Sequence, residues 1–242
     1  RIAAQVAVIG AGLAGLSAAK RLQESGVSVV VLDDGRRPGG RLATRKYHDR
    51  QFDYGAQYMK PHSRRAAVLF STWRKAGIIV PCRAQAPELP QRKKVDSTSW
   101  HVAVPSMAEL ASHLAEELDV HCRFKALDVS GEKGRWSLIG QRHQSAGPFE
   151  AVFVTCPAYQ TAKLLAPYEE FGPLLEKVES RPCLATMVEF EDEVMVDYEA
   201  AFVGNGPLAW VCLDSAKPGR TTKECWVLHA TEDWSQAHLQ DP

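Results

Sequence analysis

With 242 residues, the chain is long enough to bury a sizeable hydrophobic core as one large domain or two smaller ones. Lysine and arginine total 29, aspartate and glutamate also total 29, and the formal net charge of zero argues against a nucleic acid or a membrane surface as the partner. The six cysteines form no Cys-x-x-Cys pair, which indicates reduced thiols and a soluble protein of the cytoplasm or another reducing compartment. No apolar run approaches the length of a membrane span.

Residues 5–33 carry a dinucleotide-binding pattern. An apolar strand over residues 6–9 leads into Gly-x-Gly-x-x-Gly and then into an amphipathic helix over residues 13–24. A second apolar strand over residues 27–32 ends at an acid, whose carboxylate suits the two hydroxyls of an adenosine ribose. The glycines permit a tight turn and the close approach of a pyrophosphate, which we expect at the helix N-terminus. The predicted binding residues are Gly10, Gly12, Leu13, Ala14, Gly15 and Asp33.

A second glycine motif follows in the loop after this acid. Gly39 and Gly40 permit close backbone approach, and Arg41 offers a planar set of donors that suits phosphate; a solvated basic turn is the alternative. The run Gly-Gly-Arg-x-x-Thr resembles the flavin-containing amine oxidoreductases, in which this motif lies along the pyrophosphate and flavin of FAD. The resemblance adds Asp34, Gly39, Gly40 and Arg41 to the predicted cofactor-binding residues.

Residues 52–58 narrow the resemblance to one branch of that superfamily. The run Gly-Ala-Gln-Tyr is similar to one found in bacterial members of the renalase-like branch. The resemblance implies that the backbone of Gly55 and Ala56 and the side chain of Gln57 lie near the flavin, with Tyr58 shaping the same side. The alternative is a strand whose tyrosines pack on the core.

The middle of the chain alternates helices and strands. Helical spacing predicts a helix from about Pro61 to Gly77 that opens a second domain, and residues 81–99 predict a loop or irregular hairpin at its edge. An amphipathic helix follows Met107, and Ser106 is placed to cap it.

Two further segments are expected to return to the cofactor. A strand over residues 121–129 should rejoin the cofactor domain, and by resemblance the backbone near Ala126 brackets the adenine. Thr155 opens a Thr-Cys-Pro-Ala run that resembles the Ala-Thr-Pro-Ala turn of the family, so Thr155 is also predicted to bind the cofactor. Cys156 is interpreted as a small packing residue and not as a nucleophile. A helix, a proline break and a second helix follow over residues 161–175.

The last part of the chain predicts an antiparallel substrate layer. Alternating strands are expected over residues 186–190, 209–213 and 225–229, with a hairpin turn at residues 204–207. Two runs within this layer resemble paired stretches of the bacterial renalase-like proteins, which implies that His229 faces the substrate above the flavin. On spacing alone, a histidine borne by a strand is more often structural. Ser215 stands where the named renalases have an asparagine. The predicted catalytic residues are His229, Ser215, Gln57 and Tyr58.

The predicted fold class is α/β, with a Rossmann-type FAD-binding domain and a second α+β substrate domain built on an antiparallel sheet. The FAD-binding domain is expected over residues 1–60 and 101–165, and the substrate domain over residues 61–100 and 166–242. Folds of this superfamily close with a strand and helix that return to the cofactor through a Gly-Asp turn. No such turn follows Trp234, so we expect this return segment to be missing from the chain.

The resemblance implies a renalase-like activity with noncovalent FAD. Isomeric dihydronicotinamides of the NAD(P)H type would pass a hydride to flavin N5, and oxygen would accept the electrons to give peroxide. A flavin-dependent amine oxidase is the first alternative, with Trp210, Trp226 and Trp234 as candidate aromatic walls. A non-catalytic FAD-binding or dinucleotide-binding module is the second. The partner is expected to be a small molecule, and the scattered histidines predict no metal site.

Overall fold

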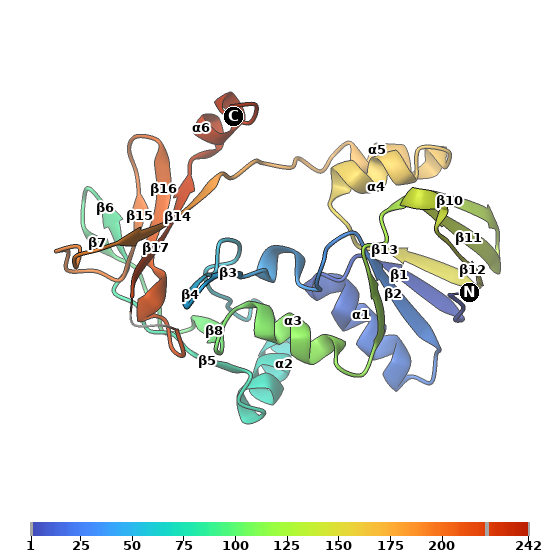
Figure 1. Cartoon of the computed structure of the whole chain (residues 1–242), viewed down its shortest axis with the longest axis horizontal. Coiled ribbons are helices and arrows are strands. Elements are labelled where there is room, and N and C mark those ends of the chain that lie inside the picture. The colour runs from blue at the N-terminus through green and yellow to red at the C-terminus, as the bar shows by residue number, and fades with distance from the viewer. Residues whose placement is uncertain (1, 221–222, 242) are drawn as a thin grey trace. The chain divides into compact units, whose positions relative to one another are not determined.

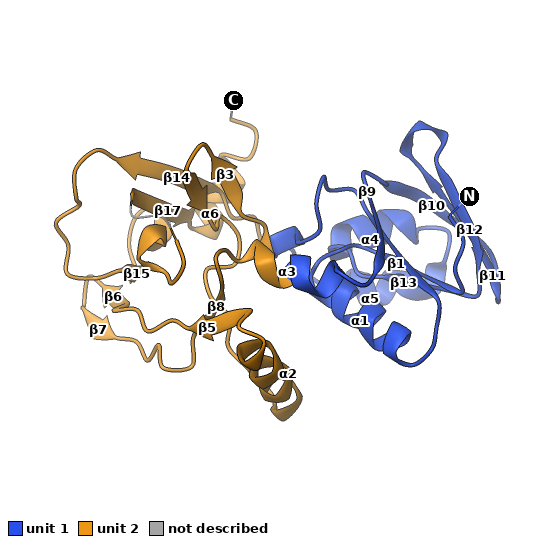
Figure 2. Cartoon of the chain, turned by 60° about the horizontal axis from the view of Figure 1, so that its bottom comes forward, with its two compact units in different colours: residues 1–41, 111–180 blue, residues 42–110, 181–242 orange. Residues whose placement is uncertain are grey.

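The computed structural model describes residues 2–220 and 223–241 (Figure 1). The chain divides into two compact units (Figure 2). Unit 1 contains the residues up to 41 together with 111–180, and unit 2 contains 42–110 together with the residues from 181 onward. The chain therefore changes unit at other places than the boundaries expected from the sequence, and the first crossing follows Arg41 directly.

A parallel sheet forms the centre of unit 1. Its strand order is β13-β1-β2-β9, and α1 connects β1 to β2. The bounds are β1 (Val6–Ile9), α1 (Leu13–Glu24), β2 (Val29–Asp33), β9 (Asp119–Cys122) and β13 (Ala151–Val154). This arrangement confirms the predicted α/β class. The residues of β1 are all buried, as are the four apolar residues of β2, because helices or a second sheet cover both faces.

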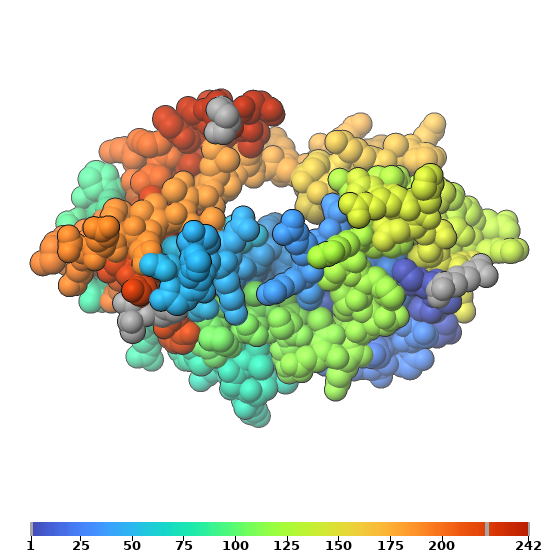
Figure 3. Space-filling view, in the orientation of Figure 1, coloured from blue at the N-terminus to red at the C-terminus, as the bar shows by residue number. Residues whose placement is uncertain are grey.

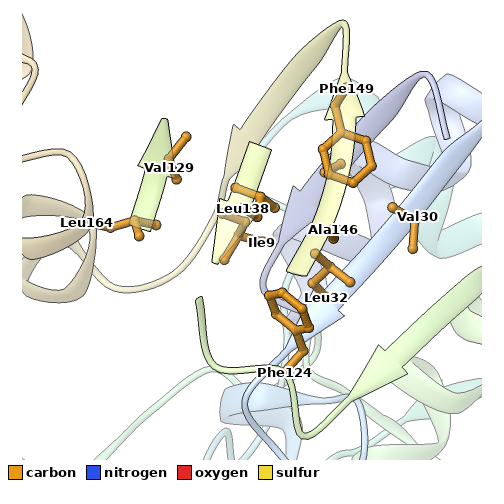
Figure 4. Close-up of a cluster of buried hydrophobic side chains, with 10 residues drawn as sticks. Ile9, Val30, Leu32, Phe124, Val129, Leu138, Ala146, Phe149 and Leu164 are labelled. Atoms are coloured by element: carbon orange, nitrogen blue, oxygen red, sulfur yellow. The ribbon is translucent and has the colours of Figure 1, made fainter. Parts of the chain in front are cut away.

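An antiparallel sheet packs on the parallel one within unit 1. It consists of β10 (Ala126–Glu132), β11 (Arg135–Gly140) and β12 (Ser145–Phe149). Figure 4 shows Leu138 and Phe149 of this sheet beside Ile9, Val30 and Leu32 of the parallel sheet, in one hydrophobic cluster. The helical segments α4 (Ala158–Leu164), η3 (Glu169–Phe171) and α5 (Gly172–Leu175) follow β13, and η2 (Gln141–His143) lies before β12.

The prediction of one continuous strand over residues 121–129 is wrong. Arg123 adopts a left-handed backbone conformation with φ of 61°, which ends β9 and turns the chain out of the parallel sheet. The amide of Phe124 then donates to the carbonyl oxygen of Asp33 over 2.8 Å, and β10 begins in the antiparallel sheet at Ala126. The chain returns to unit 1 as expected, but as two strands in different sheets.

Unit 2 is built on a mainly antiparallel sheet. Its order is β14-β17-β16-β15-β6-β7, in which only the pairing of β15 with β6 is parallel among the described strands. The strands are β6 (Pro87–Leu89), β7 (Lys93–Lys94), β14 (Ala185–Phe190), β15 (Ala200–Val203), β16 (Leu208–Leu213) and β17 (Glu224–Ala230). The three late strands and the hairpin turn predicted from the sequence are therefore confirmed.

Shorter elements complete unit 2. They are β3 (Arg45–Tyr47), β4 (Arg50–Phe52), α2 (Arg64–Lys75), β5 (Ile79–Pro81), β8 (His101–Ala103), η4 (Asp214–Ala216) and α6 (Glu232–Ala237). The turn η1 (Gly40–Leu42) and helix α3 (Ala108–Ala115) each contain a point at which the chain changes unit.

Helix α2 has one buried face and one solvent-facing face. The Ser63 side chain accepts a hydrogen bond from the Ala66 amide and caps the helix, while Phe70 and Trp73 are buried. Val68 is 63% exposed, and Figure 3 shows the turquoise atoms of α2 on the surface. This confirms the amphipathic helix predicted here.

The N-terminus of α3 is capped by other residues than the one predicted. The hydroxyl of Ser106 is buried and has no hydrogen-bond partner in the described part of the chain. Instead, the Met107 amide donates to Asp53 Oδ1 over 3.0 Å, and the Ala108 amide donates to Thr44 Oγ1 over 3.2 Å. Oxygen atoms distant in the sequence thus take the role that local spacing assigned to Ser106.

Candidate functional site

The first glycine motif of unit 1 forms a turn that leaves no room for a Cβ atom at two of its three glycines. Gly10 has φ of 107°, and a Cβ on Gly15 would lie 1.9 Å from the Gly10 carbonyl oxygen. A Cβ on Gly10 would meet Thr155 Oγ1 at 2.8 Å. Glycine is therefore required at both positions by the protein's own packing.

Gly12 differs from the other two glycines of this motif. It is the N-cap residue of α1, with φ of −77°, and a Cβ built on it would meet no atom within 4 Å. The space beside Gly12 is open, and glycine has no side chain with which to cap the helix. The first amides of α1 are thus suited to an anion, as the sequence predicts.

The second glycine motif lies directly against the first. The Gly39 amide donates to the Ala11 carbonyl oxygen over 2.8 Å, and Gly12 and Gly39 form an isolated parallel bridge. Gly40 has φ of 52°, and a Cβ on it would lie 3.4 Å from Gly12 Cα. The structure therefore brings the two predicted motifs together at the start of α1.

Asp33 is held rigidly at the end of β2. Its Oδ2 accepts a hydrogen bond from the Ala11 amide over 2.6 Å, and its Oδ1 accepts one from the Gly35 amide over 2.7 Å. A carboxylate has about four acceptor positions, so each oxygen can accept another hydrogen bond. The oriented carboxylate fits the ribose role predicted for it.

Thr155 closes the glycine turn from the neighbouring strand. Its hydroxyl lies 2.8 Å from the Ile9 carbonyl oxygen and 3.1 Å from that of Gly10. Since a carbonyl only accepts, the Thr155 hydroxyl is the donor, and its contacts are with the turn itself. A direct role in cofactor binding remains a prediction for this residue.

The other residues predicted to bind the cofactor in unit 1 lie around this turn or at the edges of the sheets. Ala14, Asp34, Gly40 and Arg41 are exposed, and Leu13 is half-buried. Asp34 is 3.7 Å from the Lys125 ammonium, and Ala126 begins β10 just beyond. Gly55, Ala56 and Gln57 belong to unit 2.

The glycine turn matches the needs of the dinucleotide part of FAD in two respects. A pyrophosphate needs free amides and an approach without a Cβ, and Gly12 at the start of α1 supplies both. An adenosine ribose needs an oriented acceptor, and Asp33 supplies it. The residues of unit 1 therefore fit the dinucleotide part of the cofactor.

In unit 2 the structure brings together two of the four predicted catalytic residues. Gln57 Nε2 lies 3.4 Å from His229 Nε2, and it also donates to the carbonyl oxygens of Asp53 and of Gly55, the latter over 3.2 Å. His229 Nε2 lies 2.9 Å from the Tyr54 carbonyl oxygen. The turn at residues 53–57 and strand β17 thus meet at this pair.

Tyr58 and Ser215 have other contacts. The Tyr58 ring stacks on Trp100 with centroids 3.7 Å apart, in an aromatic cluster that also contains Trp210. Ser215 Oγ accepts a hydrogen bond from the Cys225 amide over 3.4 Å. The structure does not join these two residues to the His229–Gln57 pair, and their catalytic roles remain predictions.

A buried ion network lies next to this pair, and sequence reasoning missed it. Lys217 Nζ is 2.5 Å from Asp214 Oδ1 and 3.7 Å from Asp53 Oδ2, and Arg220 Nη2 is 2.5 Å from the same Asp53 oxygen. All these side chains are at most 5% exposed, and the acids and bases balance in charge. Lys217 Nζ also donates to Gln57 Oε1 over 3.1 Å, so the network reaches the predicted site.

Burial and charge shift the pKa values of these groups in different directions. Burial raises the pKa of Asp214, and the nearby Asp53 carboxylate raises it further. Burial acts in the same direction on Asp53, but the charges of Lys217 and Arg220 outweigh it and hold the pKa of Asp53 below its ordinary value. Burial also opposes the charge of Lys217, yet the carboxylates beside it raise its pKa. Asp53 and Lys217 therefore carry their charges at neutral pH.

The pKa of His229 is lowered. Burial is the main cause, the positive charge of Lys217 adds to it, and the hydrogen bond to the Tyr54 carbonyl opposes both. The imidazole is therefore neutral at neutral pH.

Other properties of the described residues bear on the kind of site that the chain can hold. No group of histidine, cysteine, aspartate and glutamate side chains there is suited to hold a metal ion. No described helix is long and apolar enough to cross a membrane. All six cysteines are free thiols, of which Cys82, Cys212 and Cys225 are buried.

Comparison with known families finds a match in the N-terminal part of the chain. A family described as an NAD(P)-binding Rossmann-like domain matches residues 8–75. The lysine-specific histone demethylase 1 homolog 2 of Oryza sativa subsp. japonica is 57% identical over 44 residues, or 18% of this chain and 6% of that protein. Human flavin-containing amine oxidase B is 43% identical over 61 residues, or 25% of this chain and 12% of that protein. The matches span only a small part of the length of these relatives.

Comparison with solved structures extends over the whole chain. A putrescine oxidase with redesigned cofactor binding has a TM-score of 0.73 at 13% identity, over 99% of this chain and 78% of that one. The chain has the fold of putrescine oxidase. The wild-type enzyme bound to putrescine gives a TM-score of 0.72 at 12% identity, with 99% and 78% covered. The likeness confirms the predicted combination of a Rossmann-type unit with a second unit built on an antiparallel sheet.

Proposed function

We propose that this chain is an FAD-dependent oxidoreductase, in which unit 1 binds the cofactor and unit 2 carries the substrate-binding residues. The observation that carries the proposal is the open Gly12 at the start of α1, bridged to Gly39 of the second glycine motif. A protein that binds only a nicotinamide cofactor would need the first glycine motif but not the second. The flavin-containing relatives support the choice of FAD.

The proposed cofactor site uses the residues that fit it. The amides at the start of α1 bind the pyrophosphate, Asp33 accepts from the ribose hydroxyls, and Arg41 supplies an exposed cation after Gly40. The site holds FAD without a covalent bond. When bound, FAD supplies a hydride acceptor at flavin N5.

The proposed substrate is a dihydronicotinamide, an isomer of NAD(P)H, as in the renalase-like branch. Its ring loses a hydride and becomes NAD(P)⁺, and molecular oxygen takes up the two electrons and two protons to give hydrogen peroxide. Such a donor needs orientation and not a nucleophile or a metal. The His229–Gln57 pair supports this proposal because a neutral imidazole and a carboxamide can orient a small polar ring.

Amine oxidation is the second candidate function. Its support is the match to human flavin-containing amine oxidase B and the fold shared with putrescine oxidase. A non-catalytic FAD-binding module is a third reading, and bound flavin that no donor bleaches would favour it.

The visible absorption spectrum of the purified protein tests the cofactor and the substrate in turn. We expect a flavin band that bleaches without oxygen when isomeric dihydronicotinamides are added and returns with air, with release of peroxide. Bleaching by amines and not by dihydronicotinamides would replace the substrate proposal with amine oxidation. A colourless protein that takes up no added FAD would overturn the flavoenzyme proposal.

A further inference from the structure

We propose that Lys217 is a positioning residue for His229 and acts through the carboxamide of Gln57. The inference rests on the proposed function in one respect, namely that His229 faces the substrate. It assigns a purpose to a buried cation that neither the glycine motifs nor the predicted catalytic residues explain.

The first step is the orientation of Gln57. An ammonium group only donates hydrogen bonds, so the Gln57 atom 3.1 Å from Lys217 Nζ is held as the acceptor Oε1. The Gln57 Nε2 amide therefore points the other way, toward the carbonyl oxygens of Asp53 and Gly55 and toward His229. Turning the carboxamide over would set Oε1 against these two carbonyl oxygens and Nε2 against the ammonium, so Lys217 and the two carbonyls hold one orientation together.

The second step is the proton on His229. The Tyr54 carbonyl oxygen, 2.9 Å from Nε2, can only accept, so Nε2 of His229 carries a hydrogen. Gln57 presents a donor to the same nitrogen at 3.4 Å and so cannot compete with Tyr54 for this hydrogen. If Gln57 turned over, its Oε1 would be a second acceptor for this hydrogen, which Tyr54 and Gln57 would then share.

The backbone of residues 53–55 links the carboxamide of Gln57 to His229. Gln57 Nε2 holds the carbonyl oxygens of Asp53 and Gly55, which flank the Tyr54 carbonyl. A fixed carboxamide thus fixes the acceptor to which His229 is bonded. The contacts form a continuous path from Lys217 through Gln57 and the turn to the imidazole.

The fourth step is the burial of the cation itself. Lys217 has a side chain that is 5% exposed, and Asp214 and Asp53 balance its charge together with Arg220. A buried ammonium is costly, and this network keeps it charged where a neutral amine would accept as well as donate. Its charge keeps Lys217 a donor only, which excludes the amide of Gln57 from the position of Oε1.

The Nδ1 atom of the His229 ring is left free to contact the substrate. With the hydrogen on Nε2, the neutral His229 ring has an unprotonated Nδ1, which has no partner among residues 2–220 and 223–241. An unprotonated Nδ1 accepts hydrogen bonds. The substrate would therefore present an N–H donor to His229, as the carboxamide of a nicotinamide does.

The test removes Lys217 without leaving a buried charge. The double variant Asp214→Asn/Lys217→Met removes one negative and one positive charge, so the net charge of the network is unchanged. It keeps the ion pair of Asp53 with Arg220 and loses the donor to Gln57. The matched control is Arg50→Met/Glu189→Gln, which removes a 2.6 Å ion pair of the same unit, on β4 and β14. Lys217→Arg keeps a group that only donates.

The decisive measurement is ¹⁵N NMR of the His229 imidazole in the protein without added FAD, assigned with His229→Gln. We expect wild type, the control and Lys217→Arg to show a hydrogen fixed on Nε2 and slow exchange of that hydrogen with water. We expect the double variant to keep the hydrogen on Nε2 but to exchange it faster with water, because the turn that carries the Tyr54 carbonyl is less well held. An exchange rate of the double variant that matches wild type would overturn the inference.

Activity adds a second readout. In the double variant we expect kcat/KM for the dihydronicotinamide to fall at least about tenfold, the loss expected from a misplaced hydrogen bond, with unchanged affinity for FAD. If wild type turns over no dihydronicotinamide, the proposed function fails while the NMR result still decides the role of Lys217. If the double variant does not fold, Gln57→Met leaves the ion network intact and is expected to give the same NMR change. Gln57→Met with a wild-type exchange rate of the Nε2 hydrogen would contradict the proposal.

Discussion

Single glycines of the dinucleotide turn serve different purposes. A Cβ on Gly15 would lie 1.9 Å from a backbone oxygen, whereas a Cβ on Gly12 would point into open space. The fold itself needs glycine at position 15, whereas position 12 needs glycine only if a ligand approaches. This difference separates stability from binding at two positions of one motif.

Gly15→Ala should therefore mainly lower stability, and Gly12→Ala should mainly weaken FAD binding. We expect Gly15→Ala to lower the free energy of unfolding by about 1–3 kcal/mol because the backbone must shift. Gly12→Ala should cost less than about 1 kcal/mol as a change of N-cap, yet weaken FAD binding at least about tenfold. Thermal unfolding without FAD and titration with FAD measure the two effects. Gly172→Ala is the control, since a Cβ there meets nothing within 4 Å, and equal affinities of Gly12→Ala and the control for FAD would contradict the assigned site.

The neutral state of His229 leads to a prediction on pH. Because burial lowers its pKa below the ordinary value of about 6.5, the ring should titrate below that pH in NMR, and kcat/KM should begin to fall only there. The free energy of unfolding should also depend on the protonation of this ring. Below pH of about 6.5 the unfolded chain binds a proton that the folded chain does not, so the free energy of unfolding decreases as the pH falls until the folded pKa is passed. His229→Gln should remove this part of the pH dependence, and a midpoint above 6.5 would refute the stated cause.

At the scale of elements, helix α3 shows how a cap can come from a distant part of the chain. Ser106 stands where local spacing places a cap, but its hydroxyl has no partner in the described residues, and Asp53 and Thr44 accept from the first amides instead. Thr44 also donates to Asp53 over 2.6 Å, so the two acceptors support each other.

This arrangement predicts unequal effects of two small substitutions. Thr44→Val should lower the free energy of unfolding by about 1–3 kcal/mol, because it leaves the Ala108 amide and Asp53 each short of a contact. Ser106→Ala should change it by less than about 0.5 kcal/mol or stabilise, since it removes a buried hydroxyl without a partner. Chemical denaturation of both variants measures the difference. A larger loss of stability for Ser106→Ala than for Thr44→Val would show that Ser106 is the residue that caps α3.

The elements that the sequence predicts well are those decided by neighbouring residues. Strand β1, helix α1 and the late hairpin follow from apolar periodicity and from turn residues within a few positions. The break at Arg123 was missed because nothing in the pattern marks a left-handed arginine. The buried network was missed because Asp53 and Lys217 are far apart in sequence, and a lysine followed by Pro-Gly-Arg reads as a solvated turn.

At the scale of the whole molecule, a bound cofactor should add to stability by mass action. At free FAD of about one hundred times its Kd, the free energy of unfolding should rise by about 2.7 kcal/mol. Riboflavin lacks the pyrophosphate and adenosine that fit Gly12 and Asp33, so it should raise the thermal midpoint much less. At the same FAD concentration, a tenfold weaker affinity of Gly12→Ala should roughly halve this gain, to about 1.4 kcal/mol. An equal shift with both flavins would show that the glycine turn does not bind the ligand.

The contact of Thr155 with the glycine turn has a consequence for synthesis of the protein. The turn leaves the ribosome early, but β1 pairs with β13, and the Thr155 hydroxyl bonds to the Ile9 and Gly10 carbonyl oxygens. Chains are made from the N-terminus, and domains fold as units. A nascent chain therefore completes this glycine turn only after residue 155 has emerged, and a shorter translation product exposes an unpaired edge of β1 where chaperones or aggregation can act.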